Sequence, residues 1–428
     1  MLPHIDVRAL RGFRSAAVAR LGLVGILAIV GPGLVSGFAD NDASGITTYS
    51  LAGVHFGYAL LWVILASQIV LFFTQEVGAR LGLATGQGLT GLVRDRFGVR
   101  WAAFVAVTML VANFGTTLAE YAGIGAALEL FGVPLPVSAV AAAVLMVLLI
   151  SKGSFNKVQY LFIAVGAVIS GAYVASAFLA KPDWSTAAVN LFIPHLSVAP
   201  AYWLAVVGTV GTTITPWGQA FIQAYVVDKG LRPEDLRGSR LDVALGSGIT
   251  NVVAGFIVVA CAAALWATGQ TTVTDAAGVA LALGPLAGPQ ATALFAFGLL
   301  AASLLGLGIV PLSSAYTVCE AFGWEAGVEW RWREAPAFYA LLAVFVGGGA
   351  LFVLTPGLPL LSVMFLAAVL NGLLLPFILV FVMLLARDTT LMGPLRSGWK
   401  LAALGWALTV VLVIMSLVFV AATVGGSS

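Results

Sequence analysis

Two polar segments interrupt otherwise apolar stretches of the sequence, and the first carries two carboxylates. Residues 31–50 read GPGLVSGFADNDASGITTYS and place Asp40 and Asp42 where a membrane helix would carry apolar side chains. A charge at that depth costs about 2.5–3.5 kcal/mol on insertion scales. The sequence Asp-Ala-Ser-Gly also has a low helix propensity. The Asp and Ser side chains form hydrogen bonds with backbone groups that a helix would use, and ordering Gly has a high entropic cost. The segment predicts an unwound turn in which a carboxylate and free carbonyl groups form a cation site, although it could instead end a helix at the membrane surface.

The second segment, residues 208–225, reads GTVGTTITPWGQAFIQAY. Pro216 removes a backbone donor, and the nearby glycines weaken the helix around it. A kinked but continuous helix is the alternative to a broken one. The two segments stand at the same place in two halves of five predicted helices, and an odd number of helices inverts the second half. Interrupted helices at equivalent places in inverted repeats indicate the substrate site of a secondary transporter.

A third polar feature lies between them. Asn113, Thr117 and Glu120 are spaced i, i+4 and i+7, so they share one helix face, which we expect to look inward. Three roles remain open for Glu120: a proton carrier, a second cation ligand, or a structural hydrogen-bond acceptor.

Composition shows which elements must position these residues. Of 428 residues, 61% are hydrophobic and 9% charged, against roughly 45–50% and about 25% in soluble domains. Lipid must therefore be the solvent for most of the surface. Eleven segments are long and apolar enough to span a bilayer, which predicts an all-α integral membrane protein. They centre near residues 35, 65, 115, 142, 168, 212, 255, 305, 345, 372 and 410.

Other classes of protein find little support. A net charge of +2 gives no reason to expect a nucleic-acid partner, and no soluble loop suggests an obligate protein partner. Two distant cysteines and three scattered histidines form no zinc or disulfide pattern. No nucleophile-base pair or phosphate-binding loop appears, so we do not expect an enzyme or a resident cofactor.

The basic residues predict the orientation. With a cytoplasmic N-terminus, 19 of the 20 Lys and Arg residues fall in inner loops, as the positive-inside rule requires, and only Lys181 falls outside. We therefore expect a multi-pass protein of the inner (plasma) membrane with an external C-terminus. Arg8–Arg20 before an apolar run resembles a signal peptide, but the run from Leu21 to Ala39 is long enough to be a retained first span. The inner set is Arg8, Arg11, Arg14, Arg20, Arg80, Arg94, Arg96, Arg100, Lys152, Lys157, Lys229, Arg232, Arg237, Arg240, Arg331, Arg333, Arg387, Arg396 and Lys400.

Several motifs stand in order along nearly the whole chain: GPG at 31–33 with Asp42-Ala43-Ser44-Gly45, residues 61–91, Leu118-Ala119-Glu120 with 131–135, Thr215-Pro216-Trp217, Leu375-Pro376-Phe377 and Leu391-Met392-Gly393. Together they resemble the Nramp family of divalent metal transporters. The resemblance implies a LeuT-like fold, with one five-helix repeat over about 17–181, an inverted second repeat over about 199–386 and an extra helix over about 397–423.

The positions at which the sequence departs from the family pattern indicate which metal ion the site would bind. Asp42 stands at the family's metal-binding aspartate, whereas Gly45 replaces its asparagine and Thr215 its methionine. Trp217 stands where the family has histidine, and Thr117 replaces the aspartate of its Asp-x-x-Glu pair. The resemblance thus implies a metal site made of oxygen donors near Gly45. These are Asp42, the Thr215 hydroxyl and backbone carbonyls near Ala39 and Thr212.

Oxygen donors suit Mg²⁺ and Mn²⁺, and the missing side chains leave room for water that Mg²⁺ retains. The pattern resembles the Nramp-related magnesium transporters, so Mg²⁺ or Mn²⁺ is expected as transported substrate, without obligatory proton coupling. The alternatives are a proton-coupled Mn²⁺ or Fe²⁺ importer, a sodium-coupled organic-solute symporter and a non-transporting receptor. Residues expected along a path or relay are Asp40, Glu120, Thr117, Trp217 and Asn371.

Overall fold

The computed structural model describes residues 31–151, 155–273, 276–327 and 332–425, and these ranges contain helices and no strand. The basic N-terminal stretch and the start of the first predicted span lie outside them, as do Lys152 and Arg331. The α-helices are α3 (Pro32–Ala39), α4 (Ala43–Phe56), α5 (Leu61–Thr85), α6 (Leu89–Phe97), α7 (Val99–Glu129), α8 (Leu135–Ser151), α9 (Phe155–Leu179), α10 (Trp184–Phe192), α11 (Pro200–Thr213), α12 (Pro216–Asp228), α13 (Leu236–Ala264), α14 (Ala276–Ala280), α15 (Gly284–Ala287), α16 (Ala291–Phe322), α17 (Pro336–Val353), α18 (Leu360–Ala386), α19 (Thr389–Met392) and α20 (Trp399–Gly425).

Seven helices of the described part are long and apolar enough to cross a membrane. The number is eight if α9 and α10, which meet at a sharp bend, count together as one span. The other predicted spans correspond to α8, which is slightly short, and to two spans broken into halves, α3 with α4 and α11 with α12. This arrangement confirms the all-α membrane fold expected from the sequence.

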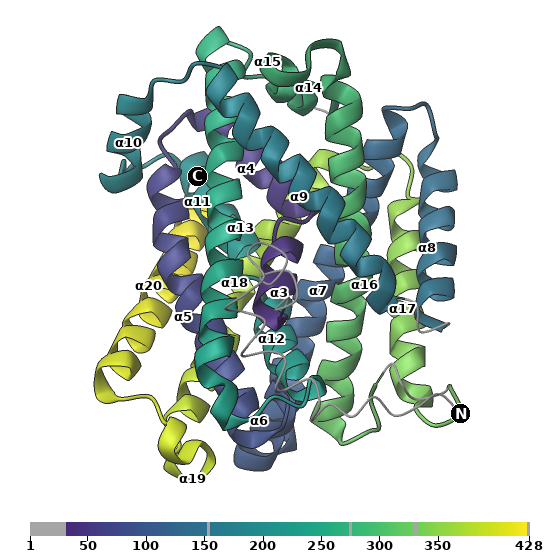
Figure 1. Ribbon diagram of the computed structural model, residues 1–428, viewed down its shortest axis with the longest axis vertical. Helices are drawn as coiled ribbons and strands as arrows, with labels where there is room; N and C mark the ends of the chain where they lie inside the picture. The colour runs from purple at the N-terminus through teal and green to yellow at the C-terminus, as the bar shows by residue number, and fades with distance from the viewer. Residues whose placement is uncertain (1–30, 152–154, 274–275, 328–331, 426–428) are drawn as a thin grey trace, which may run out of the picture.

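The half-helices α3 and α12 lie in the middle of the bundle (Figure 1). Helices α5, α13 and α20 flank them on one side, and α8 and α17 stand on the far opposite side. Helices α6 and α19 lie at one end of the molecule, and α14 and α15 lie at the other. The broken helices are thus enclosed by the continuous ones.

The α6 end holds basic residues assigned to the inner loops. Arg96 pairs with Asp388 at 2.6 Å, and Glu76 of α5 pairs with both Arg80 and Arg240. Lys181 lies between α9 and α10, and Figure 1 shows α10 toward the opposite end of the molecule. This segregation is what the positive-inside rule describes. Which end faces the cytoplasm stays a prediction.

Helix α3 packs unusually close to α13. A β-carbon on Gly33 would come within 2.6 Å of the Val243 backbone nitrogen, and Gly37 lies equally tightly against Gly246. Small residues let membrane helices approach in this way. The Thr250 hydroxyl also donates to the Gly37 carbonyl at 2.7 Å.

The Asp242 carboxylate of α13 caps the start of α3. It accepts from the backbone N–H groups of Gly33 at 2.6 Å and of Gly31 and Leu34 at 3.2 Å each. The first N–H groups of any helix lack partners within the helix. A residue about 209 positions away thus supplies what a local capping side chain would normally supply.

We predict that Asp242→Asn destabilises the protein. Asparagine turns an N–H₂ group toward backbone donors and removes the charge, and hydrogen bonds to charged groups contribute about 1.5–3 kcal/mol each. The measurement is the thermal unfolding midpoint of the chain in detergent, which should fall.

Asp95→Asn is the control, because exposed ion pairs such as Arg94–Asp95 contribute little. Equal midpoints for Asp242→Asn and the wild type would contradict the capping role.

Candidate metal site

The first break lies between α3 and α4, at Asp40–Asp42. Asp42 caps α4: its Oδ1 accepts from the Gly45 N–H at 2.8 Å and from the Ser44 hydroxyl at 2.7 Å. Its Oδ2 has no hydrogen-bond partner, although it is buried. The predicted interruption is confirmed, and one carboxylate oxygen remains available inside the protein.

The second break lies between α11 and α12, at Ile214 and Thr215. Thr215 caps α12 by accepting from the Gly218 N–H at 3.2 Å, and Pro216 occupies the first helical position, where no N–H is needed. The sequence predicted this break from Pro216.

Hydroxyl pairs hold the two breaks together. Ser44 Oγ lies 3.0 Å from Thr212 Oγ1, and Tyr49 Oη lies 2.8 Å from Thr213 Oγ1. Both pairs join the first turns of α4 to the last turn of α11. The ends of α3 and α11 also leave carbonyl groups without intrahelical partners, which is the setting of Ala39 and Thr212.

Several oxygens converge beside Gly45. A β-carbon on Gly45 would lie 3.0 Å from the Asp40 carbonyl oxygen, 3.4 Å from Thr212 Oγ1 and 3.5 Å from Asp42 Oδ1. A larger residue here would press on these oxygens. The absence of a side chain at Gly45 therefore lets three oxygens of the kind that suits a hard cation lie close to the start of α4.

Asp40 belongs to the same region but has its own partners. Its Oδ2 accepts from Gln75 Nε2 at 3.3 Å, and its Oδ1 lies near the Thr215 hydroxyl and the start of α12. Gln75 also donates to Ser36 Oγ at 3.0 Å. Sequence reasoning did not single out Gln75, although a glutamine inside the apolar run of α5 was a visible signal.

Glu120 of α7 reaches the first break. Its carboxyl lies close enough to the Asp42 carboxyl to share a hydrogen bond if one of them is protonated. It packs on Gly306 of α16, where a β-carbon would lie 2.5 Å from the carboxyl carbon. Neither of its oxygens has another side-chain donor.

The other two residues of the predicted stripe face different neighbours. Asn113 donates to Ser314 Oγ of α16 at 2.9 Å. The Thr117 hydroxyl donates to the Asn113 carbonyl in its own helix at 2.8 Å, and its methyl group faces Gly349 of α17. All three side chains are buried, but only Glu120 is placed against Asp42 by these contacts.

Trp217 and Asn371 are buried near the breaks. Trp217 packs in an apolar cluster with Val35 and Ala39 of α3 and with α16, and its indole N–H has no partner. Asn371 of α18 donates to Thr116 Oγ1 at 2.9 Å and keeps its own oxygen unpaired. Both stay predicted path residues.

The site is rich in carboxyl groups and fully buried. Asp40, Asp42 and Glu120 are each 0% exposed, and none of the ion pairs seen among the described residues involves them. The described residues hold no cluster of three His, Cys, Asp or Glu side chains arranged around one metal position. A cation here would therefore take Asp42 together with carbonyl groups, hydroxyls and water.

Comparison with known proteins gives a consistent family. The chain is 28% identical to the divalent metal cation transporter MntH of Deinococcus radiodurans, over 96% of this chain and 94% of that protein. It is 31% identical to MntH of Chromohalobacter salexigens, over 75% of this chain and 76% of that protein. Among solved structures, the manganese transporter of Eremococcus coleocola superposes with a TM-score of 0.76 at 20% identity, covering 93% of this chain and 87% of that one. The family described as natural resistance-associated macrophage protein-like matches residues 33–422. The chain belongs to this family, Nramp, and the relatives named above are transporters, not enzymes.

Proposed function

We propose that the protein carries divalent metal ions, with Mn²⁺ as the main substrate, across the plasma membrane by alternating access. The observation that carries this proposal is the unpaired Asp42 Oδ2, buried at the junction of two broken helices. The relatives support it, since two are named as divalent metal cation transporters and a structural neighbour as a manganese transporter. Movement of α3 and α12 against the enclosing helices would open the site to each side in turn.

The position of Glu120 favours proton coupling over the uncoupled transport expected from the sequence. That expectation rested on the absence of titratable groups at Thr117 and Trp217. However, the Glu120 carboxyl lies against Asp42, so a proton on Glu120 and a metal ion at Asp42 would together offset the negative charge buried there. We therefore propose Mn²⁺ import with Glu120 as proton carrier.

The donor set supports a second candidate substrate, Mg²⁺. The groups around Gly45 are oxygens, and the Thr215 hydroxyl stands where the resemblance places a methionine. Carboxylate, carbonyl and water suit Mg²⁺ as well as Mn²⁺. Millimolar Mg²⁺ should then compete with Mn²⁺ uptake, whereas a site that excludes Mg²⁺ would leave uptake unchanged.

We predict that Asp42→Asn abolishes Mn²⁺ uptake without unfolding the protein. Asparagine caps a helix as well as aspartate does, so α4 keeps its start while the site loses its charge. Affinity for Mn²⁺ should fall at least about tenfold, since even indirect partners of a metal contribute that much. Uptake into proteoliposomes, together with the unfolding midpoint, measures both effects.

Asp42→Ala removes cap and charge together, and it should also lower the midpoint because a lost cap costs about 1 kcal/mol. Asp183→Asn, at the exposed start of α10, controls for loss of a capping carboxylate far from the site. Uptake at the wild-type rate in Asp42→Asn would remove Asp42 from the mechanism.

Proton coupling is testable in liposomes loaded with a pH-sensitive dye. We expect the interior to acidify in step with Mn²⁺ uptake. Glu120→Gln, which keeps shape and packing on Gly306, should remove the acidification. Uptake by the wild type at constant internal pH would restore the uncoupled mechanism.

Thr215→Met should shift selectivity toward Cd²⁺, because a thioether suits softer metals than a hydroxyl does. The ratio of Cd²⁺ to Mn²⁺ uptake should rise several-fold, although α12 loses its cap. Thr215→Ser keeps the cap and should leave the ratio near that of the wild type. An unchanged ratio in Thr215→Met would place residue 215 away from the ion.

A further inference from the structure

The Asn41 side chain points away from the metal site and lacks every hydrogen bond it needs. It is 7% exposed, and neither its Nδ2 nor its Oδ1 has a partner. Asp40 contacts α5 and α12, and Asp42 contacts α7, whereas Asn41 faces α9, α13 and α16. Buried amides are almost always hydrogen-bonded, so this one requires a partner.

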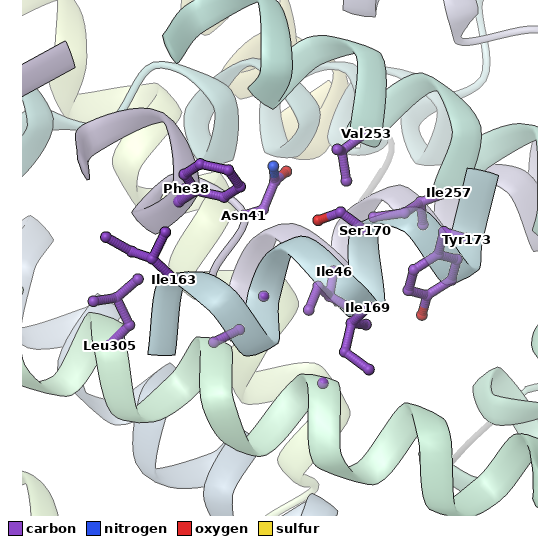
Figure 2. A pocket seen from close by; sticks show the side chains of 13 residues that line it. Phe38, Asn41, Ile46, Ile163, Ile169, Ser170, Tyr173, Val253, Ile257 and Leu305 are labelled. Carbon is purple, nitrogen blue, oxygen red and sulfur yellow. The ribbon is translucent and has the colours of Figure 1, made fainter. Parts of the chain in front are cut away.

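A small cavity adjoins this amide (Figure 2). The volume open to the centre of a water molecule is about 20 Å³. A single water needs roughly 10–15 Å³ by this measure. The cavity therefore has room for about one water and no larger ligand. Its lining residues are Phe38, Asn41, Ile46, Ile163, Gly166, Ile169, Ser170, Tyr173, Val253, Ile257, Gly298, Ala302 and Leu305.

Two polar groups of the lining face the same part of the cavity. Figure 2 shows the Ser170 hydroxyl and the Asn41 amide toward the same part of the cavity, whereas the Tyr173 hydroxyl points away from them. The rest of the lining is apolar and includes no carboxylate. One amide and one hydroxyl are too few oxygens for a bare cation, which takes six or more, but they suffice for a water.

We propose that this cavity is a water-binding site in which Asn41 and Ser170 hold one ordered water. The water fixes the unwound turn from the side opposite to the carboxylates. It joins the turn to α9, and the described part of the chain shows no direct hydrogen bond between Asn41 and that helix. Asn41 is thus a positioning residue for Asp40 and Asp42, acting through water. The transport consequences below rest on the proposed function, but the water site itself does not.

Cryo-electron microscopy of the full chain in lipid nanodiscs, at a resolution that shows ordered water, tests the site directly. We expect density within hydrogen-bond distance of both Asn41 and Ser170 in the wild type, and none in Asn41→Leu. A dry cavity, or an Asn41 amide bonded to another protein group, would overturn the proposal.

Stability gives a second measurement that does not need transport. If the Asn41 amide were unpaired, Asn41→Leu would replace a buried unpaired group with an apolar one and raise the unfolding midpoint. Because we propose that water satisfies the amide, we expect no increase. A clear rise in the midpoint would contradict the water site.

The transport readout separates positioning from general stability. Asn41→Leu should raise the KM for Mn²⁺ at least threefold, and Asn41→Ser, which can still hold water, should restore most of it. Ser170→Ala should have a smaller effect in the same direction. Ser138→Ala is the control, because the Ser138 hydroxyl is bonded within its own helix at 2.9 Å.

An unchanged KM in both Asn41→Leu and Ser170→Ala would refute the positioning role. If the wild type takes up no divalent metal while the water density is present, the proposed function fails and the water site stands. If metal uptake is normal and the cavity is dry, only the water site fails.

Discussion

The constraint on which the structure depends is the burial of carboxylates in a helix break without a basic partner. Asp40 and Asp42 are both 0% exposed, and the ion pairs of the described residues lie elsewhere. Removing such groups from water costs several kcal/mol per ion unless other groups compensate. The break itself supplies part of the compensation, since Asp42 Oδ1 accepts from the start of α4. The other oxygen of this carboxylate, Oδ2, has no hydrogen-bond donor, and a bound cation would compensate for its burial.

Tolerance of two broken helices requires that the surrounding helices hold the fragments in place. The eight-residue helix α3 is too short to be stable alone. The glycines of α3 and α13 let the two backbones pack closely, and this packing stabilises α3. Gly211 of α11 lies equally tightly against Gly372 of α18. Asp242 adds a cap to α3, and hydroxyl pairs tie α4 to α11. Each half-helix is therefore stabilised by tertiary contacts more than by its own length.

The sequence predicted the features that local chemistry dictates. Pro216 and the Asp-Ala-Ser-Gly turn indicated both breaks, and the apolar runs indicated the membrane helices. The sequence did not predict the hydrogen-bond and packing partners of the polar residues, because those partners are distant in the chain. Gln75 reaches Asp40 from α5, and Thr117 turns toward α17 although it shares a helix face with Glu120. The cavity beside Asn41 was equally unpredictable, because five separate helices line it.

Charge balance links the metal ion to the proton in the proposed cycle. If Asp40, Asp42 and Glu120 were all ionised, the buried region would carry three negative charges, and a divalent ion would leave one of them uncompensated. Even at an effective dielectric constant of 20, two unit charges about 4 Å apart interact by about 4 kcal/mol. A proton on Glu120 removes this remaining charge while the metal is bound, and hydrogen bonding to Asp42 holds the carboxyl in place when the metal has left. The contact between these two carboxyls, more than the number of titratable residues in the bundle, is therefore the feature on which the proposed coupling of metal and proton rests.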